Sequence, residues 1–375
     1  MGLFSKPEAY LGVDIGAHGI KVVELHKNKG RPQLWTYGLL DEELDIHIDE
    51  MHEKTPEELL TKNPIKGEKA NPVGFAVDEA KINYYADLLK NLLKQTKVTT
   101  KKVTASLPVS YVFHSVVTLP RVEDKEIEHM VMAEVKKMLP RPIEEMQIVW
   151  QKIPETKEDL ESKYLRILVT AAPKELVRFY SYIFQKAGLE LQELETEAFA
   201  LERSLVGHDK AIMMVVDIGA ERTNFFIIDQ SLPLIHRSIN LGGRNLDNIL
   251  KNTLDVDESL VGQIKKDLSK INSGIDYSLF SSFIDPIIKE IEYSFDLFLN
   301  QTGNQGKKPE KIVLTGGPSV LPFIKARLAK EFPIKVFVGD PWARVVYQDG
   351  IKTLLDTLGP RMSVAIGLAL RNIND

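Results

Sequence analysis

The sequence contains no cysteine, which excludes disulfides, thiolate nucleophiles and cysteine metal sites. It also lacks any apolar run of about 18 residues, the length that a membrane-spanning helix needs. The first ten residues are too short and too polar for a signal peptide, and Lys6 stands where a myristoylation signal has a hydroxyl residue. We therefore expect a protein that does not span or cross a membrane unaided.

The sequence also lacks an excess of positive charge. Its 48 basic and 53 acidic residues give a net charge of -5, and the pI is near 6.0. Such a balance provides no general attraction to nucleic acid, so we expect no nucleic-acid partner. The composition, 43% hydrophobic and 27% charged, is that of a folded protein. A chain of 375 residues exceeds what one hydrophobic core usually supports, which predicts at least two domains.

The chain opens with three apolar runs that predict a meander of strands over 11–16, 20–27 and 33–40. Residues 41–72 are acidic and contain prolines, which predicts a surface excursion with at most a short helix. The patterns that follow predict helices over 79–95, 124–139 and 174–187 and strands over 101–108, 112–120, 146–153, 164–171 and 189–195.

The second half repeats the opening. A short helix over 197–205 leads to strands over 211–217, 222–229 and 232–240, in the same order as the first meander. The order of elements therefore indicates a duplicated chain. Beyond the meander, residues 244–304 are mostly helical, a strand over 311–317 opens into a helix through Pro318, and an apolar helix follows over 359–371.

Each meander ends its first strand on an aspartate that Ile-Gly-Ala follows, in VDIGAHG and in VDIGAER. Gly16 and Gly219 let backbone amides approach a ligand, and amides in a tight turn suit phosphate oxygens. Asp14 and Asp217 would repel phosphate unless a divalent cation, such as hydrated Mg²⁺, stands between them. A simple turn with an Asx cap is the alternative for one copy, but two equivalent copies favour a phosphate and metal site.

Other residues extend this hypothesis. Lys21 adds a point charge toward phosphate, and the strand-turn-helix segment LTGGPSVLPFI places a glycine pair at a helix start, where an anion is favoured. The candidate cofactor-binding residues near the three turns are Gly16, Ala17, His18, Gly19, Lys21, Gly219, Ala220, Thr223, Asn224, Gly316 and Gly317.

Two acid-glycine hairpins followed by a strand with two glycines resemble the actin-like ATPase superfamily over nearly the whole chain. Within it, the sequence resembles the PilM family of type IV pilus assembly, which is related to the cell-division protein FtsA. The segments that carry this resemblance are LGVDIGAHGIKVVEL, KKVTASLP, LETEAFALERSL, VVDIGAERTNFFII and GPRMSVAIGLALR.

The resemblance implies an α/β actin-like fold, in which two RNase H-like domains flank a nucleotide cleft and the first carries an FtsA/PilM-type inserted subdomain. The domain boundaries that it implies are 1–107, 169–200 and 355–375 for the first core subdomain, 108–168 for the insert, 201–243 and 305–354 for the second core subdomain, and 244–304 for a small helical subdomain.

The resemblance also implies ATP and Mg²⁺ as cofactors, with Asp14 and Asp217 organising the metal. Glu197 lies where the family's connecting helix contributes an acid near the metal and the attacking water, and Glu195 is the neighbouring alternative. A helix-start carboxylate that favours the helix dipole would be a purely structural explanation of Glu197. Lys265 matches the family's ribose-binding lysine, whereas Gly262 stands where the family has a glutamate.

Several positions depart from the family pattern. Ala17, His18 and Gly19 replace small hydroxyl residues in the first turn, and Glu221 and Arg222 replace small residues in the second. Backbone amides and a metal could still hold a nucleotide, but hydrolysis requires a positioned water and a stabilised transition state. We therefore expect ATP binding with at most slow hydrolysis.

By this resemblance, the protein is expected to be a cytoplasmic adaptor that associates with the inner membrane through partners. The partner implied is the cytoplasmic N-terminal segment of PilN, in a groove placed among residues 108–170; other pilus assembly proteins and self-association are left open. An FtsA-like division protein should carry an amphipathic C-terminal helix, and this sequence ends at ALRNIND. A sugar or metabolite kinase should show a catalytic aspartate and polar sugar-binding loops in its first half. Both remain alternatives.

Overall fold

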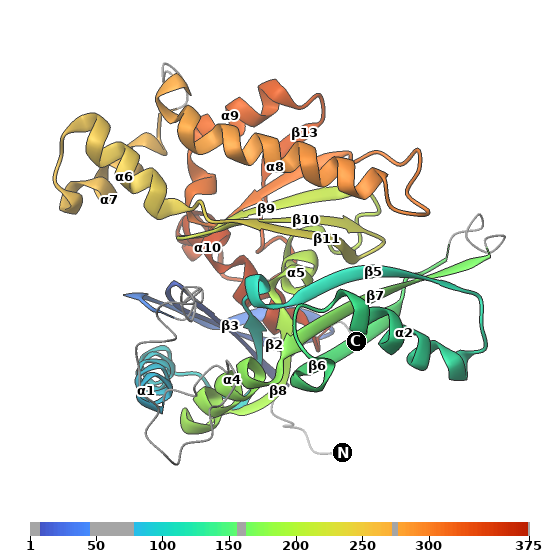
Figure 1. The fold of residues 1–375 in the computed structure, drawn as a ribbon. Helices are drawn as coiled ribbons and strands as arrows, with labels where there is room; N and C mark the ends of the chain where they lie inside the picture. Colours follow the sequence, from blue (N-terminus) through green and yellow to red (C-terminus); the bar gives the residue numbers. More distant parts are fainter. Residues whose placement is uncertain (1–7, 46–78, 156–162, 272–276, 374–375) are drawn as a thin grey trace, which may run out of the picture.

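The computed structural model describes residues 8–45, 79–155, 163–271 and 277–373, and the structural statements below concern these residues. The predicted surface excursion over 41–72 lies outside the described residues from position 46 onward. Three sheets organise the described chain, two of five strands and one of three (Figure 1).

The first sheet has the strand order β3-β2-β1-β4-β8. It consists of β1 (Ala9–Gly16), β2 (His18–Asn28), β3 (Arg31–Glu43), β4 (Lys102–Leu107) and β8 (Glu190–Thr196). The first three strands form the predicted antiparallel meander, and β4 and β8 then add in parallel beside β1. Parallel addition requires crossover connections, which contain α1 (Glu79–Thr96), the three-stranded sheet and α4 (Lys174–Lys186).

The second sheet has the order β11-β10-β9-β12-β13, which repeats the topology of the first. Its strands are β9 (Met213–Ile218), β10 (Thr223–Asp229), β11 (Leu232–Ile239), β12 (Lys311–Thr315) and β13 (Lys335–Val338). Here too a meander is followed by two parallel strands. The predicted duplication is therefore confirmed, and β1 and β9 occupy equivalent central positions.

The third sheet, of order β5-β7-β6, lies between β4 and α4 in the chain. It consists of β5 (Phe113–Pro120), β6 (Met146–Lys152) and β7 (Tyr164–Pro173), and α2 (Asp124–Met138) covers one of its faces. The buried residues Ile127, Val131 and Val135 repeat every four positions along α2, as the apolar pattern predicts. We call β5, α2, β6 and β7 the insert.

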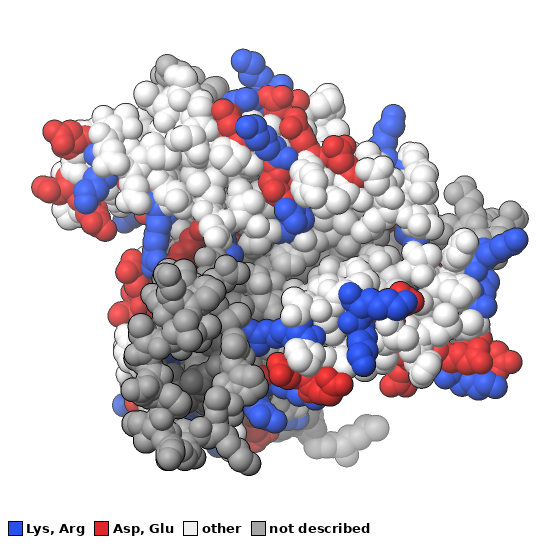
Figure 2. Space-filling view, in the orientation of Figure 1, with Lys and Arg blue, Asp and Glu red and all other residues white. Residues whose placement is uncertain are grey.

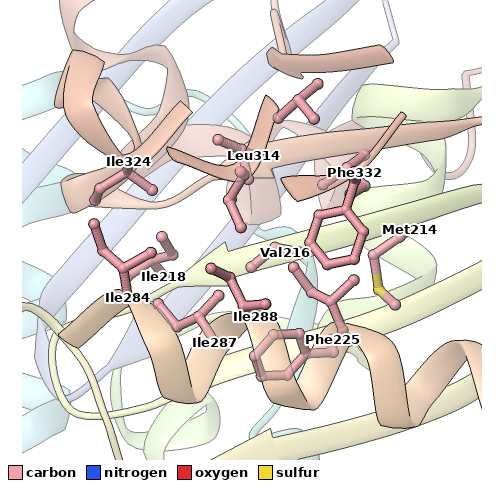
Figure 3. Close-up of a cluster of buried hydrophobic side chains, with 14 of the residues drawn as sticks. Met214, Val216, Ile218, Phe225, Ile284, Ile287, Ile288, Leu314, Ile324 and Phe332 are labelled. Atoms are coloured by element: carbon pink, nitrogen blue, oxygen red, sulfur yellow. The ribbon is translucent and has the colours of Figure 1, made fainter. Parts of the chain in front are cut away.

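Helices cover the two larger sheets. On the first sheet, α1 (Glu79–Thr96) and α4 (Lys174–Lys186) share one apolar core. On the second sheet, α8 (Ser281–Leu299) and α9 (Pro322–Glu331) pack their isoleucine and phenylalanine side chains against β9, β10 and β12 (Figure 3). Each such side chain contributes roughly 1.5–3 kcal/mol on burial. Beyond this core, α6 (Gly243–Leu254) and α7 (Glu258–Leu268) project to one side (Figure 1).

Two helices lie between the larger sheets: α5 (Glu197–Leu201), which a single π-helical turn over Glu202–Val206 extends, and α10 (Lys352–Leu370). Val364 and Leu368 of α10 share a core with strands of the second sheet, while Ala365 and Ala369 pack against strands of the first. The two halves of the chain therefore meet on these helices.

Three predictions about elements were wrong in detail. The four-residue strand β13 was not predicted, because so short a strand carries little periodicity. The helix expected to open through Pro318 begins at Pro322, after a 3₁₀ turn over Gly317–Val320. The last helix begins at Lys352, before the expected start at 359, and contains Pro360. The Pro360 carbonyl accepts hydrogen bonds from the Gly316 amide and the Thr315 hydroxyl, at 2.9 and 3.0 Å.

The visible surface carries charges of both signs. Lysines and arginines alternate with aspartates and glutamates over the face drawn in Figure 2, without a continuous basic stripe among the described residues of that face. No helix in the described part of the chain combines the length and apolar character needed to cross a membrane.

Candidate functional site

The first acid-glycine hairpin joins β1 to β2. In its register Asp14 lies opposite Lys21, and Gly16 lies opposite Gly19. The Asp14 side chain is buried, accepts a hydrogen bond of 3.0 Å from the Ser106 hydroxyl of β4, and lies 3.2 Å from the Lys21 ammonium. The strand end therefore holds a fixed carboxylate and a cation side by side.

Two positions of this turn are occupied by glycine for different structural reasons. Gly19 has a φ of +100°, and a Cβ there would lie 1.7 Å from the Leu40 carbonyl oxygen of β3, so only glycine fits. A Cβ on Gly16 would lie 3.1 Å from the Lys21 ammonium, so Gly16 keeps open the space in front of that charge. Ala17 is buried, whereas His18 is half exposed, 3.8 Å from Asp41, and burial lowers its pKa. Gly16 and Lys21 thus lie together on the side of the turn that carries Asp14.

The second hairpin joins β9 to β10, and its register places Asp217 opposite Asn224. The turn closes through a hydrogen bond of 2.9 Å from the Gly219 amide to the Arg222 carbonyl. Thr223, predicted as a donor to the ligand, is fully buried and donates its hydroxyl proton to the Leu241 carbonyl at 2.6 Å. Of the two polar residues predicted after this turn, Asn224 is therefore the one that lies beside the aspartate.

The start of α6 packs directly on the second turn, a feature that the sequence interpretation missed. The amides of Gly243 and Arg244 donate to the carbonyls of Gly219 and Ala220, both at 2.8 Å, and a Cβ on Gly242 would lie 2.6 Å from Ala220. The segment LGGRN, a glycine pair before a helix, was the available signal.

Arg244 also explains an unexpected residue in the second turn. Its guanidinium forms an ion pair with Glu221 and lies 3.3 Å from the Glu43 carboxylate at the end of β3. Glu221, which would repel a phosphate, is therefore neutralised within the second half of the chain. The contact to Glu43 joins that half to the first.

The third turn follows β12. Gly316 has a φ of +85°, and a Cβ there would lie 2.1 Å from the Ile218 carbonyl oxygen and 2.8 Å from the Asp217 carboxylate. Gly317 is partly exposed, with no atom closer to its Cβ position than an Arg361 carbon at 3.9 Å. The structure therefore places the third turn against Asp217. This follows because β9 and β12 are neighbouring parallel strands that end at the same edge of the sheet.

Asp14, Asp217 and Glu197 come together as one acidic cluster, formed by the ends of β1 and β9 and the start of α5. Burial and the Asp14 charge raise the pKa of Asp217 from 3.8 to about 7, with Lys21 and Asn224 opposing the shift. Burial, followed by the charges of Asp14 and Asp217, raises the pKa of Glu197 well above its usual value. The halves thus place carboxylates against one another at a cost in free energy that a bound cation would offset.

Two other predicted residues have different surroundings. Glu195, the alternative to Glu197, forms ion pairs with Arg203 and, at 2.7 Å, with Arg371, so its charge is already balanced. Lys265 on α7 pairs with Asp247 on α6 at 2.6 Å, and a Cβ on nearby Gly262 would meet no atom within 4 Å. Among the residues that the structure describes, Lys265 makes no contact with the acidic cluster.

The residues around the acidic cluster provide groups of the kind that bind Mg²⁺ and phosphate. Among the described residues, no group of three or more histidine, aspartate or glutamate side chains is arranged to hold a metal ion directly. Mg²⁺ commonly binds through one or two carboxylates and otherwise through water and phosphate oxygens, which two opposed aspartates can serve. Among the described residues, the buried Asn224 carbonyl oxygen has no hydrogen-bond partner, and a Cβ on Gly16 or Gly317 would meet no atom closer than 3.1 Å. The residues present fit a hydrated cation and a phosphate.

A separate cavity of about 770 Å³ lies at the start of β1 and β4, the end of the first sheet opposite Asp14. Its lining includes the exposed Trp35 ring, which stacks on His26 at 4.4 Å between ring centroids. None of the predicted site residues lines this cavity, so it is distinct from the acidic cluster.

The raised pKa of Asp217 predicts a dependence of stability on pH. Because the folded state holds this proton up to about pH 7 and the unfolded state only to about 3.8, the unfolding free energy of the nucleotide-free protein should fall as pH rises between these values. Asp217→Asn should therefore raise the unfolding free energy at about pH 8 by roughly 1 kcal/mol or more and change it little at about pH 4. Urea denaturation at both values measures this. If Asp217→Asn were less stable than the wild type at about pH 8, the repulsion between the Asp217 and Asp14 carboxylates would be contradicted.

Two proteins of solved structure share the fold of this chain. A chain of a PilM-PilN type IV pilus biogenesis complex has the same fold, with a TM-score of 0.75, 23% sequence identity, and coverage of 98% of this chain and 99% of that one. The ethanolamine utilization protein EutJ from Carboxydothermus hydrogenoformans matches with a TM-score of 0.53 and 14% identity over 98% of this chain and 91% of its own. The predicted actin-like α/β fold class is thereby confirmed.

The sequence itself decides the family. The model of the type IV pilus assembly protein PilM family matches residues 68–373, most of the chain, and includes the second acid-glycine hairpin, the glycine pair and the insert. The protein belongs to the PilM family of type IV pilus assembly proteins.

Proposed function

We propose that this protein is an ATP-binding cytoplasmic adaptor of the inner-membrane assembly complex of a type IV pilus or a related type II secretion system. In this proposal the nucleotide state controls binding of the cytoplasmic N-terminal segment of a PilN-like membrane protein. The observation that carries the proposal is the acidic cluster, which two topologically identical sheets form together beside three glycine turns.

ATP with Mg²⁺ would bind across this cluster. Asp14 and Asp217 would hold the hydrated cation, and Gly16, Lys21, Gly219 and the third turn would face the phosphates. When bound, the cation supplies positive charge between carboxylates that otherwise repel one another, so ligand binding favours approach of the two halves. Lys21, 3.2 Å from Asp14, keeps a second positive charge at the same place.

At most slow hydrolysis is expected. The first turn offers no hydroxyl side chain, and the Thr223 hydroxyl proton is already donated to Leu241. Glu197 is the residue that would contact the attacking water, yet burial and the neighbouring aspartate charges raise its pKa and so disfavour its charged form. A binding and switching role therefore suits these residues better than fast turnover.

The insert provides a route from the cleft to a partner. It belongs to the first half by connectivity, but it contacts the second half through His114, whose ring nitrogen lies 2.5 Å from the Pro233 carbonyl oxygen, and through Arg166, 3.0 Å from Asn304. Ile153 and Leu168 of the insert region are buried in the second half's core. A change in the angle between the halves would therefore act on the insert, beside which we place the peptide groove.

The adaptor role predicts that ATP changes peptide affinity. A fluorescent peptide with the N-terminal cytoplasmic sequence of the PilN-like partner should bind with affinities that differ at least about 5-fold between the nucleotide-free and Mg²⁺·ATP states, as measured by anisotropy. A scrambled peptide is the control for sequence. Asp217→Ala should keep the nucleotide-free affinity and lose the effect of ATP. Absence of peptide binding in both states would refute the adaptor role, and equal affinities with ATP bound would refute the coupling.

A further inference from the structure

Tyr180 has an unusual environment for a tyrosine in this protein. It lies on α4 in the core of the first sheet, fully buried, and its hydroxyl has no hydrogen-bond partner among the residues that the structure describes. A buried hydroxyl without a partner costs free energy, which a phenylalanine of nearly the same shape would avoid. Packing in the core therefore does not explain why this residue is tyrosine and not phenylalanine.

The hydroxyl lies beside the acidic cluster. Tyr180 shares its apolar core with Ile15, the residue after Asp14, and with Leu107 at the end of β4. The charges of Glu197 and Asp14 act on the hydroxyl and, with burial as the larger cause, raise the pKa of Tyr180. This region thus contains a buried hydrogen-bond donor that has no acceptor among the described residues.

The helix that carries Tyr180 is continuous with the insert. α4 begins at Lys174, directly after Pro173 ends β7, and the Lys174 ammonium donates a hydrogen bond of 2.7 Å to the Glu144 carbonyl before β6. Tyr180 is less than two turns further along the same helix. A contact made by its hydroxyl would connect the acidic cluster to the element that holds the insert.

We propose that Tyr180 is a positioning residue whose hydroxyl donates a hydrogen bond to Glu197 when Mg²⁺·ATP orders the acidic cluster. The contact fixes the Glu197 carboxylate and ties α4, and with it the insert, to the liganded arrangement. This inference rests on the proposed ATP site. It assigns the unused hydroxyl a role that exists in the bound state alone.

The first test concerns the nucleotide-free protein. Tyr180→Phe should leave the thermal unfolding midpoint unchanged or raise it by about 1–3 °C, because it removes an unpartnered polar group. Tyr182→Phe, an exposed tyrosine on the same helix, is the matched control and should change nothing. A clear loss of stability in Tyr180→Phe would show that the hydroxyl supports the fold and would overturn the inference.

The second test adds the ligand. Mg²⁺·ATP should bind Tyr180→Phe about 5- to 10-fold more weakly than the wild type, and the substitution should have no further effect in a Glu197→Ala background, which lacks the acceptor. Equal affinity of Tyr180→Phe and the wild type, or additive effects in the double variant, would overturn the inference alone. If the wild type does not bind Mg²⁺·ATP, the ATP site fails, and the inference fails with it.

Discussion

Replacing Asp14 or Asp217 with alanine is expected to weaken binding of Mg²⁺·ATP at least about 100-fold, a loss of about 2.7 kcal/mol. Each aspartate ends the central strand of one sheet, and we propose that the two hold one cation between the halves. Removing either leaves the cation with a single carboxylate, so the charge that offsets the phosphates is held more weakly. Equilibrium binding of a fluorescent ATP analogue measures the effect.

The controls separate this loss from misfolding. Because burial and the Asp14 charge disfavour the Asp217 carboxylate, Asp217→Ala should not unfold more easily at neutral pH than the wild type, whereas Asp14→Ala loses contacts to Ser106 and Lys21 and its folding is checked separately by circular dichroism. Asp229→Ala is a matched control: this buried aspartate ends β10 at the opposite end of the second sheet and pairs with Lys307 at 2.5 Å. It should lose stability and keep ATP affinity. Wild-type affinity in Asp14→Ala and Asp217→Ala would exclude the proposed metal site.

Gly367→Ala is expected to reduce the unfolding free energy by about 3 kcal/mol or more. Gly367 lies in α10 where that helix crosses α5, and a Cβ there would lie 1.8 Å from the Ala200 carbonyl oxygen. Since the obstacle is backbone, the helices must separate. α5 begins with Glu197, so the substitution should also weaken ATP binding. Chemical denaturation measures the first effect and the fluorescent analogue the second.

The control for this substitution is another helical glycine. Gly262 is exposed on α7, and a Cβ there would meet no atom within 4 Å. Gly262→Ala should therefore stabilise the protein by about 0.5–1 kcal/mol, because alanine favours helix. If Gly367→Ala were as stable as the wild type, the close crossing of α5 and α10 would be contradicted.

The sequence allowed the larger features to be predicted because they depend on local periodicity. Alternating apolar residues and two VDIGA segments predicted both meanders and their equivalence, and the structure confirms that the two sheets share one strand order. Asp14 and Asp217 could be paired because they follow equivalent strands of the two meanders, whereas Glu197 was predicted through the family resemblance, with Glu195 as its alternative.

Features that depend on distant partners could not be predicted in this way. The Glu195 ion pair with Arg371 joins residues 176 positions apart, and the Thr223 hydroxyl bonds to Leu241, a carbonyl with no side-chain signal. Pro360 usually indicates a helix boundary, yet α10 continues through it while its carbonyl binds the third turn. The sequence gives no signal for the unpartnered hydroxyl of Tyr180, because a lack of partners is visible only in three dimensions.

The most direct test of the central claim is a calorimetric titration of the wild-type protein with ATP, once with Mg²⁺ and once with EDTA. A cation shared by Asp14 and Asp217 between the halves predicts one ATP per chain in Mg²⁺ and at least about 10-fold weaker binding in EDTA. Absence of binding in Mg²⁺, or the same affinity in EDTA, would contradict the account.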